Sequence, residues 1–253
     1  MKRLFFDIET SPCLGWFWRP SYRTRLSYDN VIEDAKIICI SYKWHGSDKV
    51  KTLKWDKKQS DKKLIHDFIK VMNSADEIIG HNGDRFDIPW VRTRALFHGI
   101  KSVPRWRTLD TLKSVRSNLK FPSNRLGDIA KYLGLEVQKM DTSFNLWKQV
   151  MAGDKEALAY MVEYCEYDVL VLERVYEKIV KFVPGKTHAG VQDGGPKWSC
   201  PHCGSTHLVR NGTDVTRAGT ESQKMKCKSC SKSYRLTTKQ YSKYLEYKLR
   251  TNS

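Results

Sequence analysis

The 253-residue sequence lacks any hydrophobic run of the roughly 18 residues that a membrane-spanning helix needs. Its amino terminus reaches Asp7 after three apolar residues, which excludes the long hydrophobic stretch of a secretory signal. It has no internal repeat and no low-complexity tract, and acidic residues are scarce, with 28 Asp and Glu against 45 Lys and Arg. We therefore expect a cytoplasmic protein that has no membrane partner.

What is present is the composition of a globular protein. Hydrophobic residues make up 40% and aromatic residues 11% of a chain that is long enough to bury a substantial core. The formal net charge of +17 favours a polyanionic partner, because neutralising phosphates is a common use of so large a basic excess. A basic surface that serves only solubility is the alternative.

Strand-like and helix-like patterns alternate along the first 180 residues, which predicts an α/β fold. The expected strands are Arg3–Thr10, Lys36–Trp44, Lys49–Trp55 and Glu77–His81, and the expected helices are Lys62–Asn73, Ile88–His98 and Lys155–Val183. Asp110 is expected to end a strand or to cap a helix.

A composition change divides the chain. The stretch Val183–Trp198 has two prolines, four glycines and no periodicity, so we expect a linker there. Residues 186–253 carry 13 Lys and Arg but only four Asp and Glu. The predicted division is a domain at 1–185, a linker at 186–197, a cysteine-rich module at 198–236 and a basic tail or helix at 237–253.

Two acids stand one residue apart in the apolar segment "LFFDIET". In a strand, Asp7 and Glu9 point to the same face and repel each other, and a divalent cation between them would remove the conflict. An exposed strand end with both acids in water is the alternative.

Two further acids lie in apolar surroundings. Asp87 follows Phe86 in "IIGHNGDRFDIPW", where the pattern changes from strand to helix. Asp168 lies one helical turn after Tyr164, on a face shared with Met161 and other apolar residues. A carboxylate on a buried face is costly unless it is paired or bound to metal.

The three segments together resemble the motifs of the DEDD exonuclease superfamily, in its tyrosine-bearing (DEDDy) branch. Asp7-Ile8-Glu9 matches the first motif, Asn82-x-x-x-Phe86-Asp87 the second and Tyr164-x-x-x-Asp168 the third. The resemblance covers residues 1 to 183. It implies an RNase H-like fold, a mixed five-stranded sheet flanked by helices.

The resemblance also implies a reaction and a set of roles. Two Mg²⁺ or Mn²⁺ ions would be held by carboxylates, with Asp7, Glu9 and Asp168 on one ion, Asp7 also reaching the second, and Asp87 supporting the second through water. Such ions serve both ends of a phosphodiester hydrolysis. Because an unperturbed phenol has a pKa near 10, we assign Tyr164 to orienting the attacking water.

Substrate contacts are expected from residues beside these motifs. The expected contacts on the first and second motifs are Thr10, Asn82 and Phe86. The aromatic cluster of Trp16, Phe17 and Trp18 would either stack on the terminal nucleotide or, as we favour, pack in the core or anchor a loop. His81, Asp84 and Asp110 are expected to be structural.

The cysteine-rich module contains two Cys-x-x-Cys pairs. Cys200 and Cys203 are followed, after 23 intervening residues, by Cys227 and Cys230, which resembles a zinc ribbon with one structural Zn²⁺. Disulfides are disfavoured in a reducing compartment, and a redox dithiol would not explain two pairs. His202 and His207 are possible substitute ligands.

Basic residues of this module, including Arg210 and Lys224, are expected to grip a nucleic-acid backbone, and docking to a protein is the alternative. The resemblance to the DEDDy branch implies a metal-dependent 3′–5′ exonuclease that prefers DNA to RNA, either free-standing or associated with a replication or repair protein. An RNA-trimming RNase D-like exonuclease and a non-catalytic nucleic-acid-binding protein on an inactive nuclease fold are the alternatives.

Overall fold

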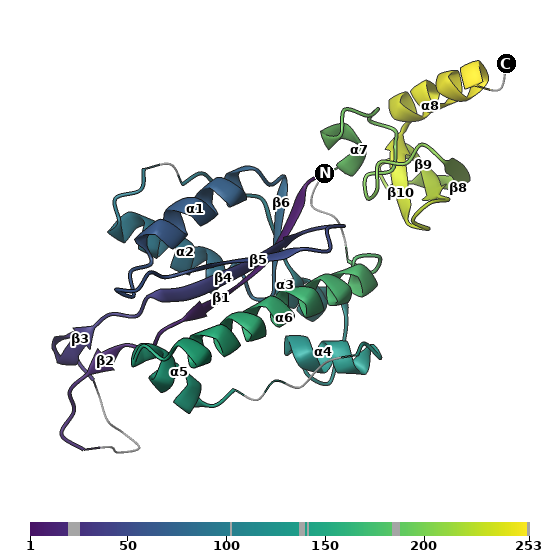
Figure 1. The fold of residues 1–253 in the computed structure, drawn as a ribbon. Coiled ribbons are helices and arrows are strands. Elements are labelled where there is room, and N and C mark those ends of the chain that lie inside the picture. Colours follow the sequence, from purple (N-terminus) through teal and green to yellow (C-terminus); the bar gives the residue numbers. More distant parts are fainter. Residues whose placement is uncertain (20–25, 102, 137–139, 141, 184–187, 252–253) are drawn as a thin grey trace. The chain divides into compact units, whose positions relative to one another are not determined.

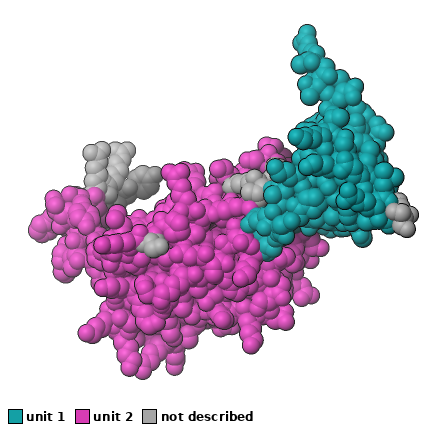
Figure 2. All heavy atoms as spheres, turned by 90° about the horizontal axis from the view of Figure 1, so that it is seen from above, with its two compact units in different colours: residues 1, 180–253 teal, residues 2–179 magenta. Residues whose placement is uncertain are grey.

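The computed structural model describes residues 1–19, 26–101, 103–136, 140, 142–183 and 188–251 (Figure 1). The chain divides into two compact units, one of residues Lys2–Ile179 and one of Val180–Ser253 together with Met1, which Figure 2 colours separately. Each unit is described by itself below.

The larger unit is built on a mixed five-stranded sheet with the order β5-β4-β1-β6-β7. Strand β1 pairs antiparallel with β4 and parallel with β6; β5 is antiparallel to β4, and β7 is parallel to β6. The strands are β1 Arg3–Thr10, β4 Ile37–Trp44, β5 Val50–Lys54, β6 Glu77–Gly80 and β7 Thr108–Asp110. A small ribbon of β2 (Leu14–Gly15) and β3 (Val31–Glu33) follows β1, with a short 3-10 helix at Tyr28–Asn30 before β3.

Helices cover both faces of the sheet (Figure 1). Helices α1 (Lys62–Asn73) and α2 (Asp87–Phe97) lie on one face, and the long α6 (Lys155–Ile179) lies on the other. The α5 helix (Phe144–Met151) packs beside the first half of α6, while α3 (Thr111–Asn118) and α4 (Leu126–Tyr132) pack against its second half. The predicted α/β class, with a mixed sheet between helices, is confirmed.

The alternation of side chains along β1 explains how the fold presents its acids. Leu4, Phe6 and Ile8 are buried in the core formed with α1 and α2. Phe5 points to the opposite face, where its ring lies 5.2 Å from that of Tyr176 on α6. Asp7 and Glu9 share the face of Phe5, so both carboxylates lie under α6.

A buried ion cluster beneath α2 was not predicted. The Asp61 carboxylate, fully buried, accepts hydrogen bonds from Arg94 at 2.6 and 2.8 Å, from His98 at 2.6 Å and from the Ile37 amide at 3.1 Å. The hydrogen bonds from Arg94 and His98 keep the pKa of Asp61 below its usual value, against the opposing effect of burial. This cluster ties the start of α1 to α2 and to β4.

The smaller unit contains a three-stranded antiparallel sheet in the order β10-β9-β8. Its strands are β8 Leu208–Val215, β9 Glu221–Cys227 and β10 Ser233–Thr237, and helix α8 (Thr238–Thr251) follows. Trp198, Leu208, Met225, Leu236 and Tyr244 form its small core. The sequence 237–253, expected to be a tail or helix, is helical over Thr238–Thr251, and 252–253 lie outside the described residues.

The stretch expected to be a linker differs from that expectation. Residues 186–187 lie outside the described part, but the remainder contains a short helix, α7 (Ala189–Gln192), whose Ala189 amide donates to the Pro201 carbonyl at 2.8 Å. A Cβ atom at Gly190 would lie 2.0 Å from the Ser199 Oγ, so the glycine permits this close packing. Glycines that suggested a flexible linker thus serve contact within the folded unit. In the described part of the chain, no helix is long and apolar enough to cross a membrane.

Candidate active site

The structure brings three of the sequence-predicted acids together. Asp7 and Glu9 of β1 and Asp168 of α6 each offer one carboxylate oxygen to a group whose members all lie within 4.8 Å of one another. Asp168 lies 161 positions after Asp7 in the sequence, but the helix that carries it packs directly on the sheet that contains Asp7. Oxygen ligands at this spacing suit a hard divalent cation such as Mg²⁺ or Mn²⁺.

Asp87, the fourth predicted acid, does not belong to this three-residue group, but its charge acts on Asp7. It is the first residue of α2, and its side chain is 3% exposed. Asn82, in the turn between β6 and α2, has a φ of +67°, a left-handed conformation that asparagine tolerates better than most residues. The carboxylate accepts backbone hydrogen bonds from its own amide and from that of Ile8, which directs it toward β1.

The electrostatics of this group are unfavourable without a cation. Burial, together with the charges of Asp87, Glu9 and Asp168, raises the pKa of Asp7 well above that of an ordinary carboxyl group. Burial chiefly raises the pKa of Glu9 to about 8, that of Asp87 to about 7 and that of Asp168 to about 6. Among the ion pairs of the described residues, none reaches these four acids. A divalent cation would offset the repulsion, so the residues fit such an ion.

Tyr164 lies one turn before Asp168 on α6, and the two side chains form a hydrogen bond. Burial and the charges of Asp168, Glu9 and Asp7 raise the pKa of Tyr164, so its phenol stays protonated at neutral pH. The hydroxyl group can therefore hold or donate a proton at the edge of the carboxylate group, but it does not act as a base.

Cys165 of α6 is a neighbour of Asp7 that none of the three sequence motifs includes. Its thiol is buried and lies 3.4 Å from the Asp7 carbonyl oxygen and 3.7 Å from the Asp7 Oδ2. The contact follows from the helical period, because Cys165 and Asp168 are three residues apart on the side of α6 that faces β1. That spacing was the available signal.

The structure gives hydrogen-bond partners or exposure for each residue expected to contact substrate. Thr10 ends β1, and its carbonyl oxygen accepts a 3.0 Å hydrogen bond from Trp147. The backbone N–H of Asn82 donates a hydrogen bond to the Asp110 carboxylate, which also caps α3. Phe86 immediately precedes Asp87 and is 41% exposed. Thr10, Asn82 and Phe86 stay predicted substrate contacts.

The residues expected to be structural form hydrogen bonds with neighbouring elements of the fold. His81 contacts the Thr111 hydroxyl and the Asn124 carbonyl oxygen, both at 2.9 Å. Asp110 both ends β7 and caps α3, accepting from the Lys113 amide at 3.1 Å. Asp84 accepts from Thr108 at 2.5 Å.

The favoured interpretation of the aromatic cluster after β1 was wrong. Trp16, Phe17 and Trp18 are 76%, 55% and 104% exposed, so they neither pack in the core nor anchor a loop. Apolar composition cannot distinguish a core segment from an exposed apolar surface, and here the three side chains, which follow β2, are exposed. Stacking on a nucleotide is the interpretation that this exposure leaves open.

The four cysteines of the smaller unit form a second group. Their Sγ atoms lie within 4.8 Å of one another, with Cys200–Cys230 and Cys203–Cys227 each at 3.6 Å. A tetrahedral zinc ion with Zn–S bonds of about 2.3 Å separates its ligands by about 3.8 Å, whereas a disulfide needs about 2.05 Å. The geometry therefore fits zinc and is compatible with a zinc ribbon. Neither His202 nor His207 belongs to the group.

A third group, His45, Glu173 and Glu177, lies near the end of β4. Glu173 already pairs with Lys43, and it accepts the Gly46 amide at 3.4 Å. A lysine therefore occupies the position of a cation.

Arg210 and Lys224, the predicted phosphate contacts of the smaller unit, lie on β8 and β9. Arg210 donates to Gln223 and Thr213, both at 2.8 Å, and Lys224 lies 3.6 Å from Asp214. Both cations thus have partners within the sheet.

Comparison with known proteins shows the family to which the larger unit belongs. The RNase H superfamily model matches residues 32–180, more than half of the chain. This protein belongs to the RNase H superfamily. The match to this superfamily includes Asp87, Tyr164 and Asp168, whereas Asp7 and Glu9 lie before it.

A solved structure gives the same fold for this RNase H superfamily member. The family B DNA polymerase of the hyperthermophilic archaeon Pyrobaculum calidifontis aligns with a TM-score of 0.50 and 18% identity over 71% of this chain. The chain spans only 24% of the polymerase's length. A search of curated protein sequences gives no match.

Proposed function

We propose that this protein is a metal-dependent 3′–5′ exonuclease of the DEDDy type that hydrolyses DNA from its 3′ end. The observation that carries the proposal is the convergence of Asp7, Glu9 and Asp168 within 4.8 Å, with Asp87 close enough to raise the pKa of Asp7. Four carboxylates without a cationic side chain form a site for divalent metal rather than for acid–base work between side chains.

Each side chain has a distinct task in this proposal. Bound Mg²⁺ or Mn²⁺ ions would supply Lewis-acid stabilisation of the phosphate and a more acidic attacking water. Asp7 would contact both ions, Glu9 and Asp168 one of them, and Asp87 the other through water. The Tyr164 hydroxyl, held by Asp168, orients the attacking water and keeps its own proton. Thr10, Asn82 and Phe86 would line the terminal nucleotides.

Three further features support the choice of substrate. The chain carries a net charge of +17, which suits a polyanion. The motif order resembles that of the DEDDy branch, from which the 3′–5′ polarity and the DNA preference come. The exposed Trp16, Phe17 and Trp18 offer faces on which unpaired bases can stack.

We also propose that Cys200, Cys203, Cys227 and Cys230 hold one structural zinc ion, and that the smaller unit helps to bind nucleic acid or a replication or repair protein. A unit with so few buried apolar residues gains the folding free energy that it needs from the metal. Metal analysis of purified protein should find one zinc per chain.

The test uses DNA and RNA oligonucleotides, single- and double-stranded, labelled at either end and incubated with Mg²⁺ or Mn²⁺. The proposal predicts a ladder from 5′-labelled DNA and immediate release of mononucleotides from 3′-labelled DNA. Asp7→Asn should lower the rate at least about 100-fold, because it removes an oxygen shared by both ions, worth several kcal/mol. Asp48→Asn, which changes an exposed acid outside the site, is the matched control.

The opposite results are equally clear. Immediate release of mononucleotides from 5′-labelled DNA would show that the enzyme degrades from the 5′ end, opposite to the proposed polarity. Preferential degradation of RNA would favour the RNA-trimming alternative. Equal degradation by wild type and Asp7→Asn would show that the acids do not perform the reaction, and binding without degradation would favour an inactive nuclease fold.

A further inference from the structure

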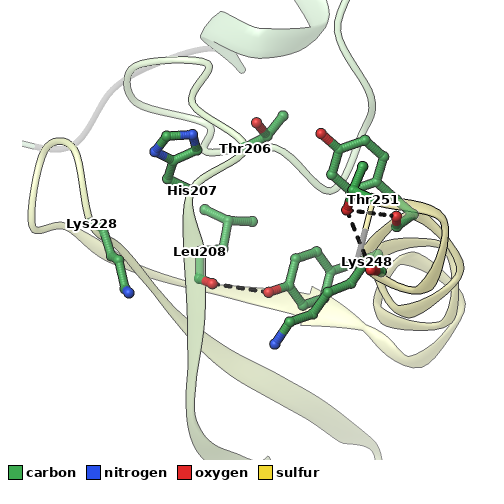
Figure 3. Close-up of a pocket in the computed structure, with 8 residues that line it drawn as sticks. Thr206, His207, Leu208, Lys228, Lys248 and Thr251 are labelled. Atoms are coloured by element: carbon green, nitrogen blue, oxygen red, sulfur yellow. Dashed lines mark hydrogen bonds between the residues drawn. The ribbon is translucent and has the colours of Figure 1, made fainter. Parts of the chain in front are cut away.

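A cavity of about 460 Å³ lies in the smaller unit, lined by the segment that follows the first cysteine knuckle, by Lys228 of the second knuckle and by helix α8 (Figure 3). Its volume falls within the range of about 300–1,000 Å³ that is typical of ligand pockets. The side chains that give it its chemistry are Thr206, His207, Lys228, Tyr247, Lys248 and Thr251. The proposed function does not use any of them.

The walls combine positive charge with an aromatic surface. Lys228 and Lys248 lie on opposite sides of Leu208 in Figure 3. Among the described residues, no salt bridge or side-chain hydrogen bond engages either ammonium group. Tyr247 is 40% exposed, and its ring packs against that of Trp198, with 4.7 Å between the ring centroids. Free cations suit phosphate oxygens, and an exposed supported ring suits a base.

The pocket is held in shape by contacts from its floor. Leu208 and Tyr244 are 7% and 5% exposed, and the Tyr244 hydroxyl donates to the Leu208 carbonyl at 2.9 Å, which fixes α8 on β8. The Lys228 amide donates to the His207 carbonyl at 2.9 Å, which joins the two cysteine knuckles. A site whose walls are already fixed loses less entropy when a ligand binds.

Three other cations of this unit, all on its sheet, already have partners. Asp214 lies against both Lys224 and Arg235, and Arg210 is hydrogen-bonded to Gln223. These groups must give up partners to bind phosphate, whereas Lys228 and Lys248 need not. The pocket should therefore bind phosphate more readily than the sheet surface that carries Arg210, Lys224 and Arg235.

We infer that this pocket binds a nucleotide within a single strand of nucleic acid, with its phosphate between Lys228 and Lys248 and its base against Tyr247. The inference rests on the proposed function for the presence of such a strand. A free mononucleotide has the same chemistry, but residues 186–253, with 13 basic and four acidic side chains, favour a longer polyanion.

The experiment measures binding of a fluorescent single-stranded DNA oligonucleotide by anisotropy over a range of salt concentrations. All proteins are the full chain with bound zinc and carry Asp7→Asn to prevent degradation. The double variant Lys228→Gln/Lys248→Gln is compared with Lys239→Gln/Lys243→Gln, which removes the same charge from exposed positions of α8 outside the pocket.

The slope of log K against log salt should fall by about 0.7 in the pocket variant, since each neutralised phosphate of a single strand contributes about 0.7. The control pair should change it less. Tyr247→Leu should weaken binding roughly 5- to 150-fold, the size of one lost stacking contact.

Equal slopes for the two double variants would overturn the inference. Displacement of the strand by a nucleoside monophosphate at equal phosphate concentration would also overturn it, by making the free nucleotide the occupant. Degradation of the oligonucleotide in the Asp7→Asn background would instead count against the proposed function, and the two failures are thus distinguishable.

Discussion

Replacing Asp168 by asparagine should stabilise the metal-free protein at neutral pH. The folded state raises the pKa of Asp168 to about 6, chiefly by burial, whereas an unfolded aspartate titrates near 3.9. The folded state therefore binds the proton more tightly, so stability is retained below about pH 4 and is lost as the pH rises to about 6. At about 1.36 kcal/mol per pKa unit, the loss is about 3 kcal/mol by pH 7.5.

Asparagine has no proton to lose, so Asp168→Asn should avoid this loss, and it also removes a charge that raises the pKa of Glu9. For a unit of this size, about 3 kcal/mol corresponds to a rise of about 6–12 °C in Tm. Calorimetry of the metal-free protein at pH 4 and pH 7.5 would show the gain at the higher pH only. Asp48→Asn, an exposed acid, should show no such gain.

Addition of Mn²⁺ should reverse the advantage at pH 7.5. A ligand present at 1,000 times its Kd stabilises the folded state by about 4.1 kcal/mol, which exceeds the advantage of about 3 kcal/mol, and the variant has lost one of the oxygens that would bind the ion. A variant that is less stable than wild type at pH 7.5 without metal, or a difference that is independent of pH, would refute the electrostatic argument.

Three other substitutions test separate parts of the structure. Tyr164→Phe removes the hydroxyl group bonded to Asp168, so it should lower the maximal rate about 10²–10³-fold, measured on DNA, while calorimetric Mn²⁺ affinity is unchanged. Arg94→Met leaves the buried Asp61 without its main partner and should cost about 3–5 kcal/mol in urea unfolding; addition of Asp61→Asn should recover part of that loss. Cys227→Ser should abolish zinc binding by metal analysis and unfold the sheet of β8, β9 and β10, while the melting of residues 2–179 is retained. Full zinc occupancy in this variant would contradict the four-cysteine site.

Much of the fold was predictable because local physics decides it. The apolar run within Arg3–Thr10 predicts a strand, and the structure has the strand at those residues. The helix Lys62–Asn73 was also predicted to the residue, since its apolar side chains recur with the helical period. The last predicted helix ends at Ile179 instead of Val183, because the apolar pattern continues past the last helical turn.

Other features depend on contacts between distant residues, which no local sequence pattern predicts. The buried Asp61 pairs with Arg94, 33 residues away, and nothing around either residue indicates the other. The exposure of Trp16 to Trp18 and the folding of α7 into the smaller unit likewise depend on what the neighbouring segments leave uncovered.

The sequence by itself determined the local elements and the spacing within each Cys-x-x-Cys pair, because each of these depends on residues within one or two turns of each other; the four acids were predicted from the resemblance of three separate motifs to a known family. Only the tertiary structure decided that Asp7 and Asp168 come within reach of one ion, and that Lys228 and Lys248 share a cavity. The reason is physical: charge repulsion, burial and cavity shape depend on distances between side chains, and the packing of sheet and helices sets those distances.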